Sequence, residues 1–133
     1  MSAGAADAAP LAAAALLIEI ARADHRCDEA ERQAIVAAVG HLHALTAEDA
    51  QALVATATEA VDDAISLDGF TGVVNRQLSR AQKIRLLEAL WRVAYADGRV
   101  DHYEEYYIRK IADLLHLGHS DFIRAKLVAE PAS

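Results

Sequence analysis

An internal duplication constrains the fold of this 133-residue chain more than any other feature of its sequence. Residues 20–35 and residues 93–108 match when one stretch is shifted by 73 positions along the other. Apolar positions coincide at both ends of the match, as with Ile35 and Ile108. Three carboxylates coincide as well: Asp24 with Asp97, Asp28 with Asp101, and Glu31 with Glu104. The duplication therefore predicts two related structural units.

The composition indicates that these units are helical. Hydrophobic residues make up 54% of the chain and are mostly Ala, Leu, Val and Ile, while aromatic residues make up only 5% and there are two prolines and six glycines. Ala and Leu favour helices, and a shortage of aromatic residues disfavours a sheet. A chain of this length can bury a core without disulfides or structural metals. We therefore predict one all-α, multihelical domain.

Apolar residues recurring at helical spacing predict about seven helices. Pro10 suits the first turn of the first helix, so we expect residues 1–9 to be a frayed terminus before a domain at 10–130. The repeat halves then cover about 10–66 and 79–130, each with three helices, and a short helix lies between them. We expect the first and fifth helices at the centre, because this lets both halves bury their apolar stripes.

Several helix starts carry capping signals, in which a short polar residue precedes an acidic or amide residue by three positions. Ser79 with Gln82 predicts the start of the fifth helix, and Thr46 with Asp49 predicts the start of the third. Asp28 with Glu31 follows the same pattern.

The charge balance and the cysteine count restrict the partners and the compartment. A formal net charge of -7 repels phosphate backbones, so we expect no nucleic-acid partner. One cysteine, Cys27, excludes an internal disulfide, which fits a reducing cytoplasm. The apolar run at residues 11–18 is too short to span a bilayer, and the first residues lack the basic start of an export signal. We expect a cytoplasmic protein without membrane insertion.

The repeated acids have two interpretations. In one, Asp28 and Asp101 are N-caps, Glu31 and Glu104 are their partners in the first turn, and Asp24 and Asp97 satisfy loop N–H groups. In the other, three carboxylates around a turn supply oxygen ligands to a hard cation, with calcium or magnesium favoured over zinc. The EF-hand signature is absent, because Arg99 and Val100 follow Gly98.

The stretch from Leu86 to Leu117, which contains A-D-G-R-V-D-H-Y-E-E, resembles the tellurite-resistance TerB-like family. With the earlier copy A-D-H-R-C-D-E-A-E, the resemblance covers nearly all of residues 11–130. It implies two repeated multi-helix halves, a role in bacterial tellurite and chemical-stress responses, and a divalent-metal site. The implied metal residues are Asp24, Asp28, Glu31, Asp97, Asp101 and Glu104. The first copy departs from the pattern, with His25 where the second has Gly98.

Other candidate chemistry is weaker. The six histidines, for which zinc is the natural metal, fall beside the acidic joints or at expected helix ends, where a cationic side chain favours the helix dipole. Cys27 aligns with Val100, which predicts an apolar packing position. No nucleophile or phosphate-loop motif is present, so we expect no enzyme.

Aromatic residues gather in the second half, with Trp91 and all four tyrosines between residues 91 and 107. They fit core packing, or a patch that binds a protein partner. We predict a non-enzymatic helical module that binds a divalent cation and acts with protein partners, and a homo-oligomer is compatible with these features. The alternative is an interaction scaffold in which the acids only cap helices.

Overall fold

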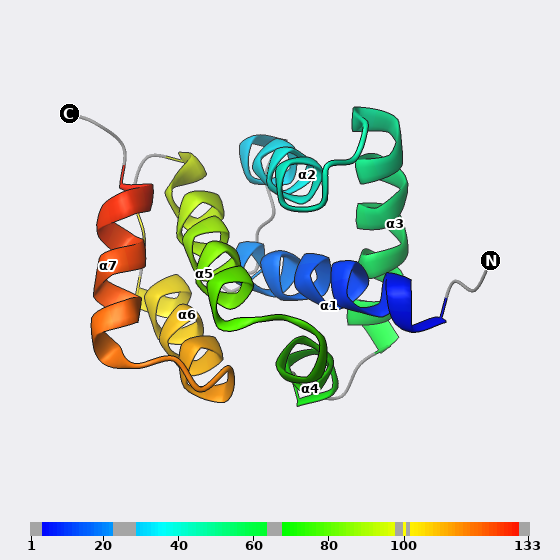
Figure 1. The fold of residues 1–133 in the computed structure, drawn as a ribbon. Helices are drawn as coiled ribbons and strands as arrows, with labels where there is room; N and C mark the ends of the chain where they lie inside the picture. Colours follow the sequence, from blue (N-terminus) through cyan, green and yellow to red (C-terminus); the bar gives the residue numbers. More distant parts are fainter. Residues whose placement is uncertain (1–3, 23–28, 64–67, 98–99, 101, 131–133) are drawn as a thin grey trace.

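The structure is a computed structural model that describes residues 4–22, 29–63, 68–97, 100 and 102–130, with the side chains of residues 4–7 and 97 left aside. Within these residues all regular secondary structure is helical, which confirms the predicted all-α class (Figure 1). The elements are α1 (Gly4–Ala21), α2 (Glu29–His43), α3 (Ala47–Asp63), α4 (Asp68–Gln77), α5 (Arg80–Ala94), the 3-10 turn η1 (Tyr95–Asp97), α6 (His102–Leu114) and α7 (His119–Ala129).

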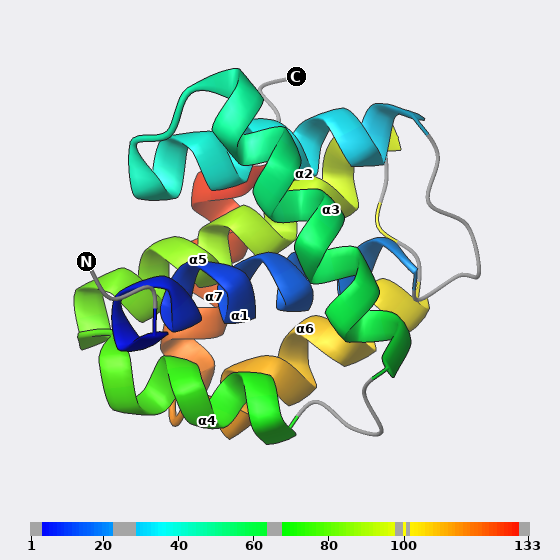
Figure 2. The same cartoon turned by 90° about the vertical axis from the view of Figure 1, so that its right-hand side faces the viewer.

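Helices α1 and α5 form the centre of the molecule. Helix α1 packs against α2, α3, α4, α5 and α6, and α5 packs against α1, α2, α6 and α7. Figure 1 shows α3 and α7 on opposite sides of this pair, and Figure 2 shows α1 surrounded by other helices. Residues 12–18 of α1 are all buried, because Ala, Leu and Ile fill this segment on every face.

The duplication extends to the packing. Leu17 and Leu90, 73 positions apart, are both fully buried in the central helices, and Ile20 and Val93 are buried in the same way. Ile35 of α2 and Ile108 of α6 continue the correspondence. Equivalent residues therefore point into the shared core from both halves.

Helices α2 and α6 end in the same manner, with a residue in the left-handed region. Ala44 has a φ of 54° and His116 has a φ of 64°, and neither is a glycine. The amide of Leu45 donates to the carbonyl of Gly40 at 3.0 Å, and the amide of Leu117 donates to that of Ala112 at 2.9 Å. These bonds satisfy carbonyls that a helix end leaves without partners. The two left-handed residues are 72 positions apart, so the second half is one residue shorter before its third helix.

The capping signals at two helix starts are confirmed. The Ser79 hydroxyl accepts from the amide of Gln82 at 3.2 Å, and the Gln82 side chain accepts from the amide of Ser79 at 2.8 Å. At the start of α3, the Thr46 hydroxyl accepts from the amide of Asp49 at 3.1 Å.

Helix α4 connects the halves and completes the end of α6. The side-chain amide of Asn75 donates to the carbonyl of Leu114 at 2.8 Å, and Lys83 of α5 donates to the carbonyl of Leu115 at 3.2 Å. These bonds hold the last turn of α6 against α4 and α5.

Helix α1 begins at Gly4, earlier than the start at Pro10 that the sequence indicates. The residues between them are mostly alanine, which has the highest helix propensity. None of the helices described above is both long enough and apolar enough to cross a membrane.

Candidate functional site at the helix joints

The predicted site residues fall on the joints before α2 and α6, and the structure describes them unequally. Glu31 and Glu104 are fully described. For Asp97 the backbone is described, at the end of η1, but its side chain is not. Asp24, Asp28 and Asp101 lie outside the described residues.

Glu31 and Glu104 are both buried, with 1% of each residue exposed. Each is the third residue of its helix, α2 or α6. Each also takes part in a noncovalent interaction, so neither carboxylate stands alone in the core. Removing a carboxylate from water is costly unless a charge or hydrogen bonds compensate for it. This unfavourable desolvation occurs twice, at equivalent positions of the two halves.

The surrounding helices explain how these side chains come to be buried. Glu31 lies on the face of α2 that carries Ile35 and Val39, since residues four apart share a helix face. Glu104 lies above Ile108 on α6 in the same way. Both carboxylates are in the first helical turn, where the positive end of the helix dipole stabilises negative charge.

These carboxylates fit a hard cation by donor chemistry, because calcium and magnesium prefer carboxylate oxygens. Among the described side chains, no three His, Cys, Asp or Glu groups gather as a metal site. Four of the six predicted ligand side chains are outside that description. The predicted set therefore stays a prediction, with Glu31 and Glu104 as its described members.

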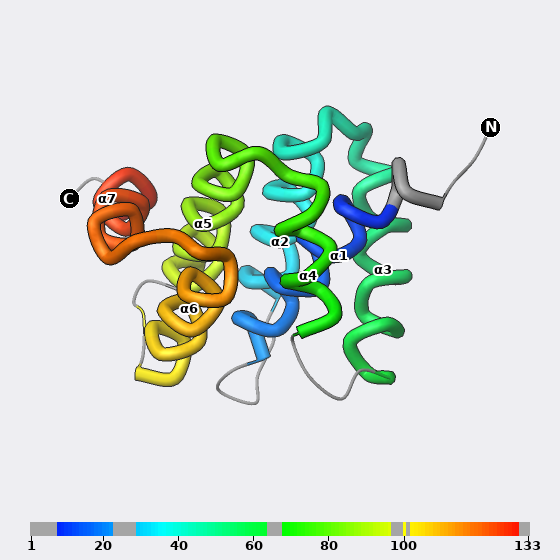
Figure 3. The backbone as a smooth tube through the Cα atoms, turned by 60° about the horizontal axis from the view of Figure 1, so that its bottom comes forward, coloured from blue at the N-terminus to red at the C-terminus, as the bar shows by residue number. Residues whose placement is uncertain are grey.

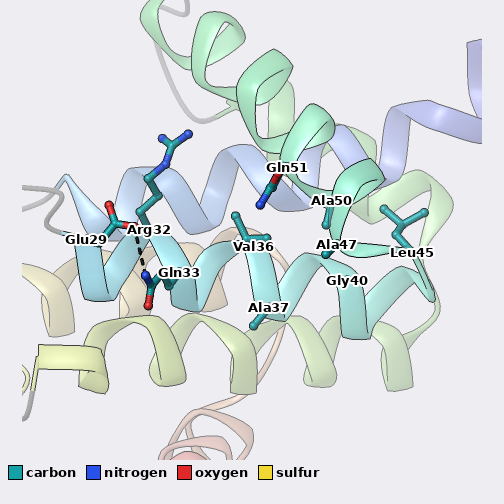
Figure 4. Close-up of a pocket in the computed structure, with 10 residues that line it drawn as sticks. All are labelled: Glu29, Arg32, Gln33, Val36, Ala37, Gly40, Leu45, Ala47, Ala50 and Gln51. Carbon is teal, nitrogen blue, oxygen red and sulfur yellow. Dashed lines mark hydrogen bonds between the residues drawn. The ribbon is translucent and has the colours of Figure 1, made fainter.

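A groove of about 590 Å³ runs between α2 and α3 (Figure 4). Its polar end is next to the first joint, where Gln33 donates to Glu29 at 3.1 Å and Arg32 extends outward. Gly40, Leu45 and Ala50 lie at its other end, where a Cβ added at Gly40 would be 3.5 Å from the Leu45 carbonyl oxygen and 3.7 Å from the Ala50 Cβ. This groove was not predicted from the sequence. Its lining residues on α2 recur at helical spacing, so the sequence could have indicated that they share one face. Its lining residues on α3 could not be predicted, because they depend on how the two helices pack.

Comparison with known protein families shows which family the chain belongs to. A family model described as "Tellurite resistance protein TerB" matches residues 10–127, which cover nearly all of both halves and include both joints. The chain belongs to the TerB family. No curated protein and no solved structure matches it.

In the described part of this TerB family member, no histidine belongs to a group of three or more His, Cys, Asp or Glu side chains that could hold a metal. His41, His102, His116 and His119 are exposed, and His43 is half-buried at the end of α2, while His25 lies outside the described residues. Burial lowers the pKa of His43 below its usual value of 6.5. Cys27 lies outside the described residues as well.

The aromatic residues of the second half divide into a buried and an exposed group. Trp91 is fully buried, and its ring lies 5.1 Å from that of Phe122 and 6.1 Å from that of Tyr95. Burial and the neighbouring carboxylate of Glu130, to which its hydroxyl donates at 3.2 Å, raise the pKa of Tyr95. Tyr103 and Tyr106 are exposed. Core packing therefore accounts for Trp91, and the two exposed tyrosines are available to a partner.

Proposed function

We propose that this TerB family protein is a non-enzymatic helical module that binds a divalent cation at its duplicated acidic joints. The observation that carries the proposal is the burial of Glu31 and Glu104 at equivalent positions beside those joints. The cation would be held by these glutamates with Asp24, Asp28, Asp97 and Asp101, and it would supply positive charge that relieves their mutual repulsion. Calcium or magnesium suits an all-oxygen donor set better than zinc does.

The family description supports a place for this module in tellurite resistance. We propose that this role extends to related chemical-stress responses and involves protein partners. The exposed Tyr103 and Tyr106 on α6 are the aromatic residues through which a partner would dock.

A second candidate function, an interaction scaffold without metal, is favoured by one specific observation. Glu31 and Glu104 occupy the third helical position, which is the position that Gln82 occupies in the capping box of α5. A glutamate there can bond the amide of its N-cap residue just as Gln82 does. The two candidate functions therefore differ in the role of these two carboxylates: in the first they bind a cation, and in the second they cap α2 and α6.

Replacing Glu31 and Glu104 together by glutamine separates the two functions. Glutamine keeps the capping hydrogen bond, as Gln82 demonstrates, but it removes the negative charge that a cation needs. Calorimetry and thermal unfolding with calcium, magnesium, manganese and zinc are the measurements. The metal-binding function predicts heat and a higher melting temperature for the natural chain, and loss of both in the double variant.

Glu29→Gln is the matched control, because Glu29 is an exposed carboxylate in the same first turn of α2. It should bind the cation as the natural chain does. If none of the four cations produces heat or a thermal shift with the natural chain, the metal-binding function is wrong and the scaffold remains.

A further inference from the structure

Helix α7 is apolar on two sides. Its inner side packs on α5 through Phe122, Ala125 and Ala129, which are buried. Its outer side carries Ile123, Leu127 and Val128, which are 38%, 64% and 52% exposed. With Arg124 these three form one continuous stripe, because residues four apart on a helix are neighbours. We call residues 123, 124, 127 and 128 the outer stripe of α7. Contiguous apolar surface of this kind marks an interaction site, whereas scattered exposed apolar residues do not.

A second exposed surface is concave. A groove of about 480 Å³ lies between the start of α1 and α3, and we call it the α1–α3 groove. Leu11, Leu45 and Leu53 give it apolar walls, and the small residues Ala52 and Thr56 lie along it on α3. Its size is within the range of about 300–1,000 Å³ typical of pockets that hold ligands.

The two surfaces also differ in charge. Helix α3 carries five acidic residues and no basic one; Asp49 lines the groove, and Asp62 is paired with Arg22, which follows α1. On α7 the carboxylate of Asp121 forms an ion pair with Arg80 at 2.9 Å. Arg124 is the charged residue of the outer stripe. Charges of opposite sign on two surfaces steer them together.

The outer stripe and the α1–α3 groove belong to corresponding helices of the two halves. When α3 is matched to α7 with the shift of 72 positions, Arg124 corresponds to Ala52 and Val128 to Thr56. One half thus presents large residues where the other presents small ones. The two helices lie at opposite ends of the molecule in Figure 1 and again in Figure 3, so the stripe cannot reach the groove of its own chain.

We propose that the outer stripe of α7 docks into the α1–α3 groove of a second copy of this chain, with Arg124 among the carboxylates of α3. The contact is head-to-tail, because it joins two different surfaces. In a pair, one molecule therefore has a free groove and the other has a free outer stripe, and each can bind a further molecule. A single helix in a single groove makes a small interface, and we therefore expect weak, reversible association.

Sedimentation velocity at increasing concentration tests the proposal on the metal-free protein, independently of the cation site. From a monomer of 14.3 kDa, the average mass should rise steadily toward about 1 mM protein without a plateau at the dimer. Added salt should reduce the association, because it screens the charges around the contact. A mass that stays at the monomer value, or one that stops at a dimer, would overturn the proposal.

Two single variants then identify the surfaces. Leu127→Asp places a carboxylate on the outer stripe, and Ala52→Arg fills the α1–α3 groove with a cation; both positions are exposed, so circular dichroism should be unchanged. Each variant alone should remain a monomer. An equimolar mixture should form a dimer and nothing larger, because one intact stripe and one intact groove remain.

Ala55→Arg is the control for Ala52→Arg, because Ala55 is exposed on the same helix and does not line the groove. It should associate as the natural chain does. Val128→Asp replaces Leu127→Asp if that variant is misfolded. A mixture that stays monomeric while the natural chain associates assigns the contact to other surfaces and overturns the proposal.

Discussion

At the scale of single residues, His43 connects the fold to pH. It lies at the end of α2, it lines the α1–α3 groove together with Asp49, and it lines a small cavity together with Arg85. Burial lowers the pKa of His43 in the folded chain below the usual value of 6.5. The unfolded chain therefore takes up a proton at a pH where the folded chain stays neutral.

We expect this difference to lower the stability of the protein in mild acid. The contribution is fully present above pH 6.5 and is lost as the pH falls from there through the folded pKa. Urea unfolding between about pH 7.5 and pH 5 measures it, and His43→Gln should flatten the pH dependence. His41→Gln, at an exposed position two residues earlier, should keep the dependence of the natural chain. An unchanged dependence in His43→Gln would contradict the assignment.

At the scale of elements, the capping box of α5 should be the most sensitive helix start that the structure describes in full. Ser79→Ala removes the hydroxyl that accepts from the amide of Gln82, and such a loss typically costs about 1 kcal/mol. We expect a drop of that size in the free energy of unfolding from urea titration. Ser120→Ala is the control, since Ser120 is exposed in the first turn of α7; its effect should stay within about 0.5 kcal/mol. An equal decrease in the free energy of unfolding in both variants would show that the Ser79 cap does not stabilise the protein more than an exposed serine does.

At the scale of the whole molecule, the two halves share one core, because α1 of the first half packs directly on α5 of the second. We therefore expect one cooperative unfolding transition. Trp91, the only tryptophan, reports on the second half by fluorescence. Leu17→Ala, in the fully buried part of α1, should lower stability by about 2–5 kcal/mol. The Trp91 signal and the circular dichroism signal should shift to the same lower midpoint, whereas a Trp91 transition left in place would indicate that the halves unfold separately.

The helical class, the duplication, the order of the helices and the helix starts at Thr46 and Ser79 could all be predicted from the amino-acid sequence alone. These features are local, because apolar periodicity and side-chain caps act within one or two turns. The sequence also pointed to Glu31 and Glu104 as candidate ligands. It could not show that both are buried, since burial depends on which helices cover the first turns of α2 and α6.

The way the two halves pack together could be seen only in the folded molecule. Folding joined Arg22 to Asp62 at 2.6 Å, and Arg80 to Asp121, across about forty residues of chain. It also formed the grooves beside α3 and left one side of α7 without cover. These features arise from packing between elements that are far apart in sequence, and no local pattern encodes the relative placement of two helices.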